Sequence, residues 1–214
     1  MRPPLINQSA RLTFAEYFKL NAEVDEVLAH FGFSFEARTA VLPVTQRELE
    51  GIEELRKRFQ EALPHISLTS EAARREFLIA PVIMELIHHT GGRVRVEYPV
   101  DVGPQLQGTL DFFMQVERSL LVIEAKNADL TRGFTQLAVE LVALDRWVDD
   151  GDRILHGAVS TGDIWQFGIL DRAAKKITQD LNLYRVPADL EPLLRILVGI
   201  LTQDQSSSSA NQGA

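Results

Sequence analysis

The sequence contains no cysteine. A disulfide framework, a thiolate zinc site, an iron–sulfur cluster and a cysteine nucleophile are therefore all excluded. Positive charge is also scarce, since 22 Lys and Arg stand against 30 Asp and Glu, for a formal net charge of -8. This balance argues against a protein that coats nucleic acid by electrostatic attraction alone, but it leaves room for basic patches around an acidic site.

Long apolar runs are missing too. The run from Leu193 to Leu201 is interrupted by Arg195, and it falls short of the ~20 apolar residues that a membrane-spanning helix needs. No targeting segment is visible, so we expect a cytoplasmic protein without a membrane partner. The 214 residues, 45% of them hydrophobic, suffice for one domain with an appendage.

The first part of the chain has mostly helical periodicity. Thr13 and Glu16 form a predicted capping box, and Ser70 is a predicted N-cap. The patterns predict helices over 14–30, 45–62 and 71–90, with a strand over 33–42. Gly91 and Gly92 end the last of these helices.

The period then changes from helix to strand. Strands are predicted over 93–100, 110–116, 120–125, 156–160 and 164–170, with a further one over 177–186, and helices over 131–148 and 188–201. This order predicts a three-layer α/β/α domain with a mixed central sheet and an extra N-terminal helical segment. We expect an N-terminal extension over 1–66, a core over 67–202 and a disordered tail over 203–214.

Three charged residues lie near the ends of two apolar strands. Glu124 and Lys126 follow the run Leu121-Val122-Ile123, and period-two alternation places both on one face of the sheet. A hairpin about Glu117-Arg118-Ser119 pairs residues whose numbers sum to about 236, so Asp111 faces position 125. Two carboxylates and one ammonium therefore meet at one end of a strand pair.

This cluster has two interpretations. One is a structural ion pair, in which Asp111 or Glu124 satisfies Lys126. The other is a site, because a buried ion pair is seldom the most stabilising choice at the end of an apolar strand. Two carboxylates suit Mg²⁺, with Mn²⁺ as a substitute, and the lysine suits a water or a developing phosphate charge. Clustered carboxylates repel, so we expect a raised pKa on at least one of them and a charged Lys126.

The neighbouring helices offer further candidates. At 100° per residue, Glu76 falls within the apolar face of the helix over 71–90, where it must be paired with an arginine or bound to a ligand. Glu71 lies at the start of the same helix, where a carboxylate is favourable in any case. Gln136 lies ten residues after Lys126 on the next helix, either solvated or in contact with a phosphate or water.

Asp111, then Glu124-Ala125-Lys126 thirteen residues later, then a helix with Gln136, resembles the PD-(D/E)XK nuclease superfamily. The segment from Ser70 to Pro81 resembles the first core helix of restriction-type members, including the nuclease region of type I restriction subunits. The resemblance covers about 70–170; Thr109-Leu110 replaces the proline of the motif. It implies a restriction-endonuclease-like fold and Mg²⁺-dependent phosphodiester hydrolysis.

The resemblance also implies roles for individual residues. Asp111 and Glu124 become metal ligands, Lys126 the catalytic lysine, and Gln136 the glutamine that follows it in a subset of members. A helix glutamate completes the metal site. Spacing to Pro81 selects Glu71, and the helical wheel selects Glu76.

The first functional hypothesis is thus a metal-dependent nuclease acting on nucleic acid, with DNA as the first candidate. The alternatives are a catalytically silent module of the same fold that binds nucleic acid or protein, and a protein whose carboxylates bind metal for stability only. The acidic net charge leaves room for a homodimer or a partner subunit. Trp147 and Trp165 are interpreted as core or dimer-interface residues.

Overall fold

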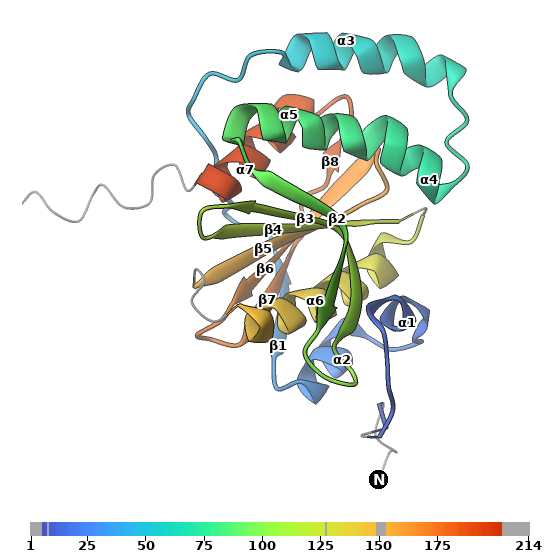
Figure 1. The fold of residues 1–214 in the computed structure, drawn as a ribbon, viewed down its shortest axis with the longest axis vertical. Coiled ribbons are helices and arrows are strands. Elements are labelled where there is room, and N and C mark those ends of the chain that lie inside the picture. Colours follow the sequence, from blue (N-terminus) through green and yellow to red (C-terminus); the bar gives the residue numbers. More distant parts are fainter. Residues whose placement is uncertain (1–5, 8, 127, 149–152, 203–214) are drawn as a thin grey trace, which may run out of the picture.

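An eight-stranded mixed sheet forms the middle layer of the molecule (Figure 1). The computed structural model describes residues 6–7, 9–126, 128–148 and 153–202. The strands run in the order β1-β7-β6-β5-β4-β3-β2, and β8 pairs with β6. Their bounds are β1 Ser34–Arg38, β2 Arg93–Asp101, β3 Gln107–Val116, β4 Ser119–Ala125, β5 Ile154–Ser160, β6 Ile164–Asp171, β7 Lys176–Asp180 and β8 Tyr184–Arg185.

Helices cover both faces of this sheet, which confirms the predicted three-layer α/β/α class. Their bounds are α1 Phe14–Lys19, α2 Val24–His30, α3 Ile52–Ala62, α4 Glu71–Arg74, α5 Ala80–Thr90, α6 Leu130–Trp147 and α7 Leu190–Thr202. A π-helical turn, Arg75–Ile79, joins α4 to α5. The predicted local signals are present, since Thr13 and Glu16 form a capping box, Ser70 accepts a hydrogen bond from the Ala73 N–H, and Gly91 ends α5 at φ 64°.

Several predicted boundaries are wrong. The helix expected over 14–30 is two helices, because Leu20 is extended and turns the chain so that the apolar sides of both helices meet α6. The helix expected from residue 45 begins only at Ile52, since the preceding segment runs beside α7, where the Thr45 N–H donates to the Arg195 carbonyl. The strand over 177–186 is divided into β7 and β8, and β1 is shorter than 33–42.

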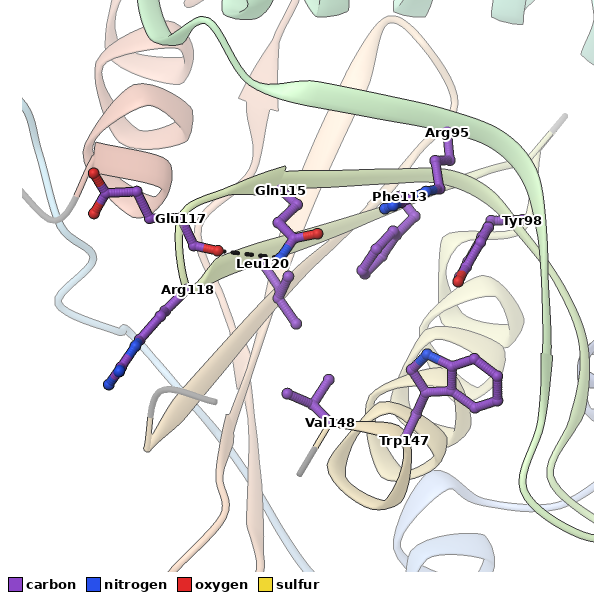
Figure 2. A pocket seen from close by; sticks show the side chains of 9 residues that line it. All are labelled: Arg95, Tyr98, Phe113, Gln115, Glu117, Arg118, Leu120, Trp147 and Val148. Atoms are coloured by element: carbon purple, nitrogen blue, oxygen red, sulfur yellow. Dashed lines mark hydrogen bonds between the residues drawn. The ribbon is translucent and has the colours of Figure 1, made fainter. Parts of the chain in front are cut away.

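The hairpin of β2 and β3 bends sharply and wraps toward α6 (Figure 1; closer in Figure 2). The ladder pairs Val96 with Phe112 and Tyr98 with Leu110 but omits the pair between them, and Glu97 has φ 52°. Leu110 packs in the α6 core, whereas Phe112 packs in the core on the opposite face. The side chains of β3 therefore alternate between the two faces of the sheet on either side of the bend, but the bend shifts the pattern by one residue.

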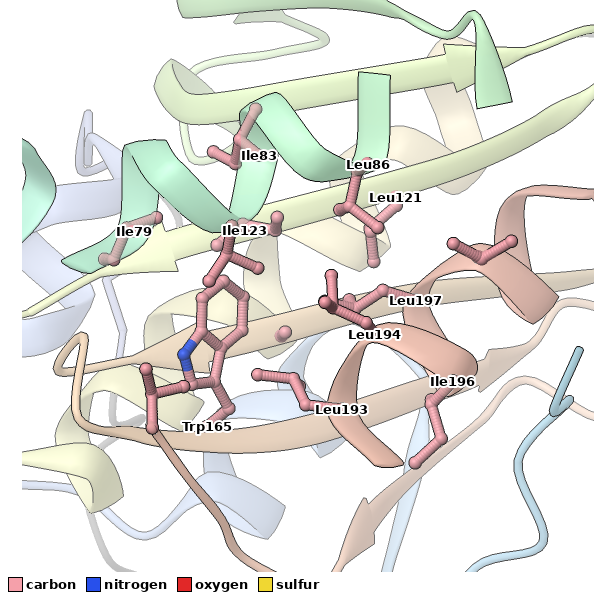
Figure 3. Packing of buried hydrophobic residues seen from close by; sticks show 14 of the residues in the cluster. Ile79, Ile83, Leu86, Leu121, Ile123, Trp165, Leu193, Leu194, Ile196 and Leu197 are labelled. Atoms are coloured by element: carbon pink, nitrogen blue, oxygen red, sulfur yellow. The ribbon is translucent and has the colours of Figure 1, made fainter. Parts of the chain in front are cut away.

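Two hydrophobic cores lie on opposite faces of the sheet. The first lies under α3, α5 and α7, with the fully buried Trp165 at its centre (Figure 3). The second lies under α6, and α1 and α2 pack on the outer side of that helix. Because the sheet and the two N-terminal helices enclose it, α6 is buried almost continuously from Gly133 to Leu144.

The N-terminal segment is integrated with the sheet. Its strand β1 pairs in parallel with β7 and forms one edge, while β2 forms the other. The expected tail over 203–214 lies outside the described residues. None of the helices in the described part of the chain has the length and apolar character to cross a membrane.

Candidate functional site

The end of β4 carries two charged side chains into the protein interior. Ile123 and Ala125 pack in the first core, so alternation turns Glu124 and Lys126 toward α6 on the other face. Glu124 is 2% exposed and Lys126 is 9% exposed. The structure thus places both residues on one face, as predicted.

Asp111 meets this pair from the bend of β3. The residue numbers of paired positions in β3 and β4 sum to 235, one less than expected, and the ladder ends at Phe112 and Ile123. Beyond that point the Asp111 carboxylate replaces a backbone carbonyl as the hydrogen-bond acceptor, because its Oδ2 accepts a hydrogen bond of 2.9 Å from the Ala125 N–H. The Asp111 side chain is therefore fixed to the backbone between Glu124 and Lys126.

A hydrogen-bonded chain continues from Glu124 into α6. The Lys126 ammonium donates to Glu124 Oε1. Gln136 Nε2 donates to the same oxygen at 2.6 Å and to Glu140 Oε1 at 2.8 Å. One amide nitrogen therefore connects two carboxylates, and Gln136, predicted as a site residue, belongs to the cluster.

Three buried oxygens of this cluster have no hydrogen-bond partner, namely Glu124 Oε2, Gln136 Oε1 and Glu140 Oε2. Buried polar atoms are usually satisfied, because an unmade hydrogen bond costs about 1–3 kcal/mol. Three such atoms surround one amide, and a proton on either carboxyl group lets Glu124 and Glu140 hydrogen-bond to each other. They offer open acceptor positions to a cation, a water or a donor.

Burial and mutual repulsion perturb the carboxyl groups. Burial, followed by the charge of Asp111, raises the pKa of Glu124 to about 7 against the opposing effect of Lys126. Burial, followed by the charge of Glu124, raises the pKa of Glu140 well above its ordinary value. Burial by itself would lower the pKa of Lys126, but the surrounding carboxylates outweigh it and the pKa is raised. Both sequence expectations, a raised carboxyl pKa and a charged lysine, are confirmed.

The helix glutamates do not join this cluster. Glu76 is exposed and has no ion pair within the described chain, so the helical-wheel placement in the apolar face is wrong. The π-helical turn Arg75–Ile79 is the reason, because Glu76 lies within it and its wider winding departs from the ideal 100° spacing. Glu71 is only partly buried, at the start of α4.

Arg75 of the same turn does reach the site. Its Nη1 lies 3.5 Å from Asp111 Oδ1 and 3.7 Å from Glu97 Oε1, and its guanidinium lies 5.2 Å from the centroid of the Phe112 ring. Sequence reasoning selected a carboxylate from this helix, and the structure supplies a cation instead. The π-helical turn that displaced Glu76 could not be read from hydrophobic spacing.

Phe18 and Gly133 lie close to the Lys126 side chain. Its ammonium lies 5.2 Å from the centroid of the Phe18 ring of α1. A Cβ on Gly133 of α6 would lie 2.9 Å from Lys126 Cγ and 2.8 Å from Val159 Cγ2. The first turn of α6 can approach the lysine stem this closely because residue 133 is glycine.

Glu140 is the member that sequence reasoning missed as a site residue. It is completely buried in α6. The available signal was a single acid within the otherwise apolar run from Leu137 to Val142. Such a residue must be paired, neutralised or bound when the helix is enclosed.

The donor chemistry is that of a hard cation, since Asp111 and Glu124 supply carboxylate oxygens and Glu124 Oε2 is buried without a partner. Across the residues that the structure describes, no group of three or more His, Cys, Asp or Glu is arranged to hold a metal. Mg²⁺ in proteins takes one or two carboxylates and keeps several waters. No protein-family model matches the sequence, and no curated protein matches it either.

Proposed function

We propose that this protein is a metal-dependent nuclease that hydrolyses phosphodiester bonds in nucleic acid. The observation that supports the proposal best is the meeting of Asp111, Glu124, Lys126 and Gln136 at one end of β4, with a buried carboxylate oxygen left unpaired. Residues far apart in the sequence converge there, although burying their charges costs free energy. Selection for stability alone rarely produces such an arrangement.

Asp111 and Glu124 are the residues that would hold Mg²⁺ or Mn²⁺. When bound, such an ion lowers the pKa of a water and offsets the charge that develops on phosphate. Lys126 holds a positive charge beside the two carboxylates, where it can orient a water or stabilise the developing phosphate charge. Gln136 keeps Glu124 Oε1 in place and leaves Oε2 open.

Approach of a substrate is expected from the Asp111 side. The side chains of Asp111 and Arg75 are 16% and 21% exposed, whereas the Glu124 side chain is 2% exposed. Arg75 adds a cation next to Asp111, suited to a phosphate oxygen. The proposal therefore assigns Arg75 to substrate binding, a role that the sequence pattern did not indicate.

The test is cleavage of single- and double-stranded DNA and RNA with Mg²⁺ or Mn²⁺. Lys126→Ala should lower the rate by about a hundredfold to a thousandfold, since it removes a group that acts mainly on the transition state. Because the substitution unpairs a buried carboxylate, Lys126→Gln and a thermal melt should accompany it. Lys57→Ala, on the exposed surface of α3, is the matched control and should cleave like the wild type.

A second candidate is a catalytically silent module that binds nucleic acid or a protein. Its support is that Lys126 and Glu124 are deeply buried and already paired with each other. Calorimetry with Mn²⁺ separates the candidates, because a nuclease site should bind the ion in the wild type and lose it in Asp111→Asn. A wild type that binds no Mn²⁺ and cuts no substrate would favour the silent module.

A further inference from the structure

A hollow lies at the opposite end of β4 and α6 from the buried cluster. It has a volume of about 290 Å³, close to the lower end of the range for small-molecule sites. It is lined by Arg95, Tyr98, Phe113, Gln115, Glu117, Arg118, Leu120, Trp147 and Val148 (Figure 2). The hollow and the proposed active site share strand β3, on which Phe113 follows Asp111 by two residues.

Aromatic rings form much of this hollow. Tyr98 and Phe113 are stacked, with ring centroids 5.2 Å apart and planes 13° from parallel. Figure 2 shows these two rings and Trp147 gathered around the hollow, with Trp147 coming from the end of α6. Trp147 is 41% exposed, whereas Trp165 is completely buried, so of the two expected positions, core or dimer interface, Trp165 takes the core and Trp147 does not. An exposed indole beside two stacked rings is suited to a planar ligand.

The charged groups of the hollow include two arginines, Arg95 and Arg118. Arg95 lies over the rings of Tyr98 and Phe113, at 5.1 Å and 5.7 Å from their centroids. Neither Arg95 nor Arg118 has an acidic partner within the described chain, and the Arg118 side chain extends from the rim (Figure 2). Glu117 is the one acid among the lining residues, so two positive charges face one negative charge.

We propose that this hollow binds one nucleotide of a single-stranded nucleic acid, with the base stacked against Trp147 and a phosphate beside Arg95 or Arg118. Base–aromatic stacking combined with arginine contacts is the usual chemistry of single-strand binding. Bases in a duplex have both faces covered by their neighbours, so a single strand fits better than a duplex. The inference rests on the proposed function, because a phosphodiester site on the same strands selects a nucleotide among planar anions.

Trp147 itself supplies the measurement. A single-stranded oligonucleotide of mixed sequence, titrated in EDTA so that no cleavage occurs, should quench the fluorescence of the exposed tryptophan, while the buried Trp165 stays constant. Trp147→Ala should weaken binding roughly 5- to 150-fold, the effect of losing one stacked base. Trp147→Phe should retain most of the affinity and lose the quenching.

Leu183→Ala removes a similarly exposed apolar side chain elsewhere and is the matched control, expected to bind like the wild type. The same sequence as a duplex should bind more weakly than the single strand. Equal affinity of Trp147→Ala and the wild type, quenching that persists in Trp147→Phe, or a preference for the duplex would each overturn the proposal.

Failure of this proposal and failure of the proposed function give different results. If cleavage depends on Lys126 but Trp147→Ala changes neither affinity nor KM, the nucleotide pocket is overturned and the nuclease stands. If no substrate is cut but single strands bind through Trp147, the pocket stands and the protein is a binding module.

Discussion

Replacement of Glu140 by glutamine tests whether the buried cluster is under electrostatic stress. Glutamine has nearly the same shape, keeps an oxygen for the Gln136 amide and cannot ionise beside Glu124. We therefore expect Glu140→Gln to be more stable than the wild type at alkaline pH, the opposite of the usual result for a fully buried polar residue.

The magnitude follows from linkage between protonation and folding. A rise of the Glu124 pKa from 4.5 to about 7 corresponds to roughly 3 kcal/mol. A raised folded-state pKa contributes stability that is fully present below pH 4.5 and is lost as pH rises through about 7. The pKa of Glu140 itself is also raised, by burial and then by the charge of Glu124, so its ionisation causes a loss of the same sign, partly offset by attraction to Lys126. We expect a net gain of about 1–2 kcal/mol above pH 8 and almost none near pH 4.5.

Thermal and urea unfolding in EDTA at a series of pH values measures this effect. For a domain of this size, 1–2 kcal/mol corresponds to a rise in Tm of about 2–8 °C. Glu54→Gln on the exposed face of α3 is the control and should show no pH-dependent difference from the wild type. A Glu140→Gln variant that is no more stable at pH 8.5, or whose difference does not change with pH, would refute the electrostatic account.

The remaining predictions concern packing and pH. Gly133→Ala should destabilise the protein by about 1–2 kcal/mol in urea unfolding, because the added Cβ would lie within 3 Å of Val159 and Lys126. This cost should exceed the gain from the better helix propensity of alanine, so a variant more stable than the wild type would contradict the packing. Asp111→Asn should leave the metal-free protein as stable as the wild type or slightly more stable, since the amide oxygen still accepts a hydrogen bond from the Ala125 N–H. A loss of more than about 2 kcal/mol in the free energy of unfolding would indicate a structural ion pair instead. Burial lowers the pKa of His156 to about 4, so the free energy of unfolding should fall by at most roughly 3 kcal/mol as pH drops from 6.5 toward 4. His156→Gln should flatten this part of the plot of stability against pH, and an unchanged slope would exclude His156 as its source.

Sequence pattern alone predicted much of the central fold. The continuous apolar run before Glu124 predicted a strand, and this was enough to place Glu124 and Lys126 on one face of β4, because alternation is a property of the extended backbone. The short Glu117–Ser119 connection likewise predicted the β3–β4 hairpin, and Ser70 and Gly91 marked helix ends through local hydrogen bonding and backbone geometry. All of these signals act over a few residues, so they can be read without knowing the tertiary contacts.

Other features were decided only by contacts between distant segments. Glu140 is buried because α1 and α2 cover the outer side of α6, and nothing within α6 itself specifies that cover. The π-helical turn exposes Glu76 and brings Arg75 to Asp111, against the ideal helical spacing. The bend at Glu97 ends the β3–β4 ladder so that Asp111 binds the Ala125 N–H. Side-chain periodicity specifies which face of an element is apolar, whereas the path of the chain around that element decides which polar groups are enclosed with it.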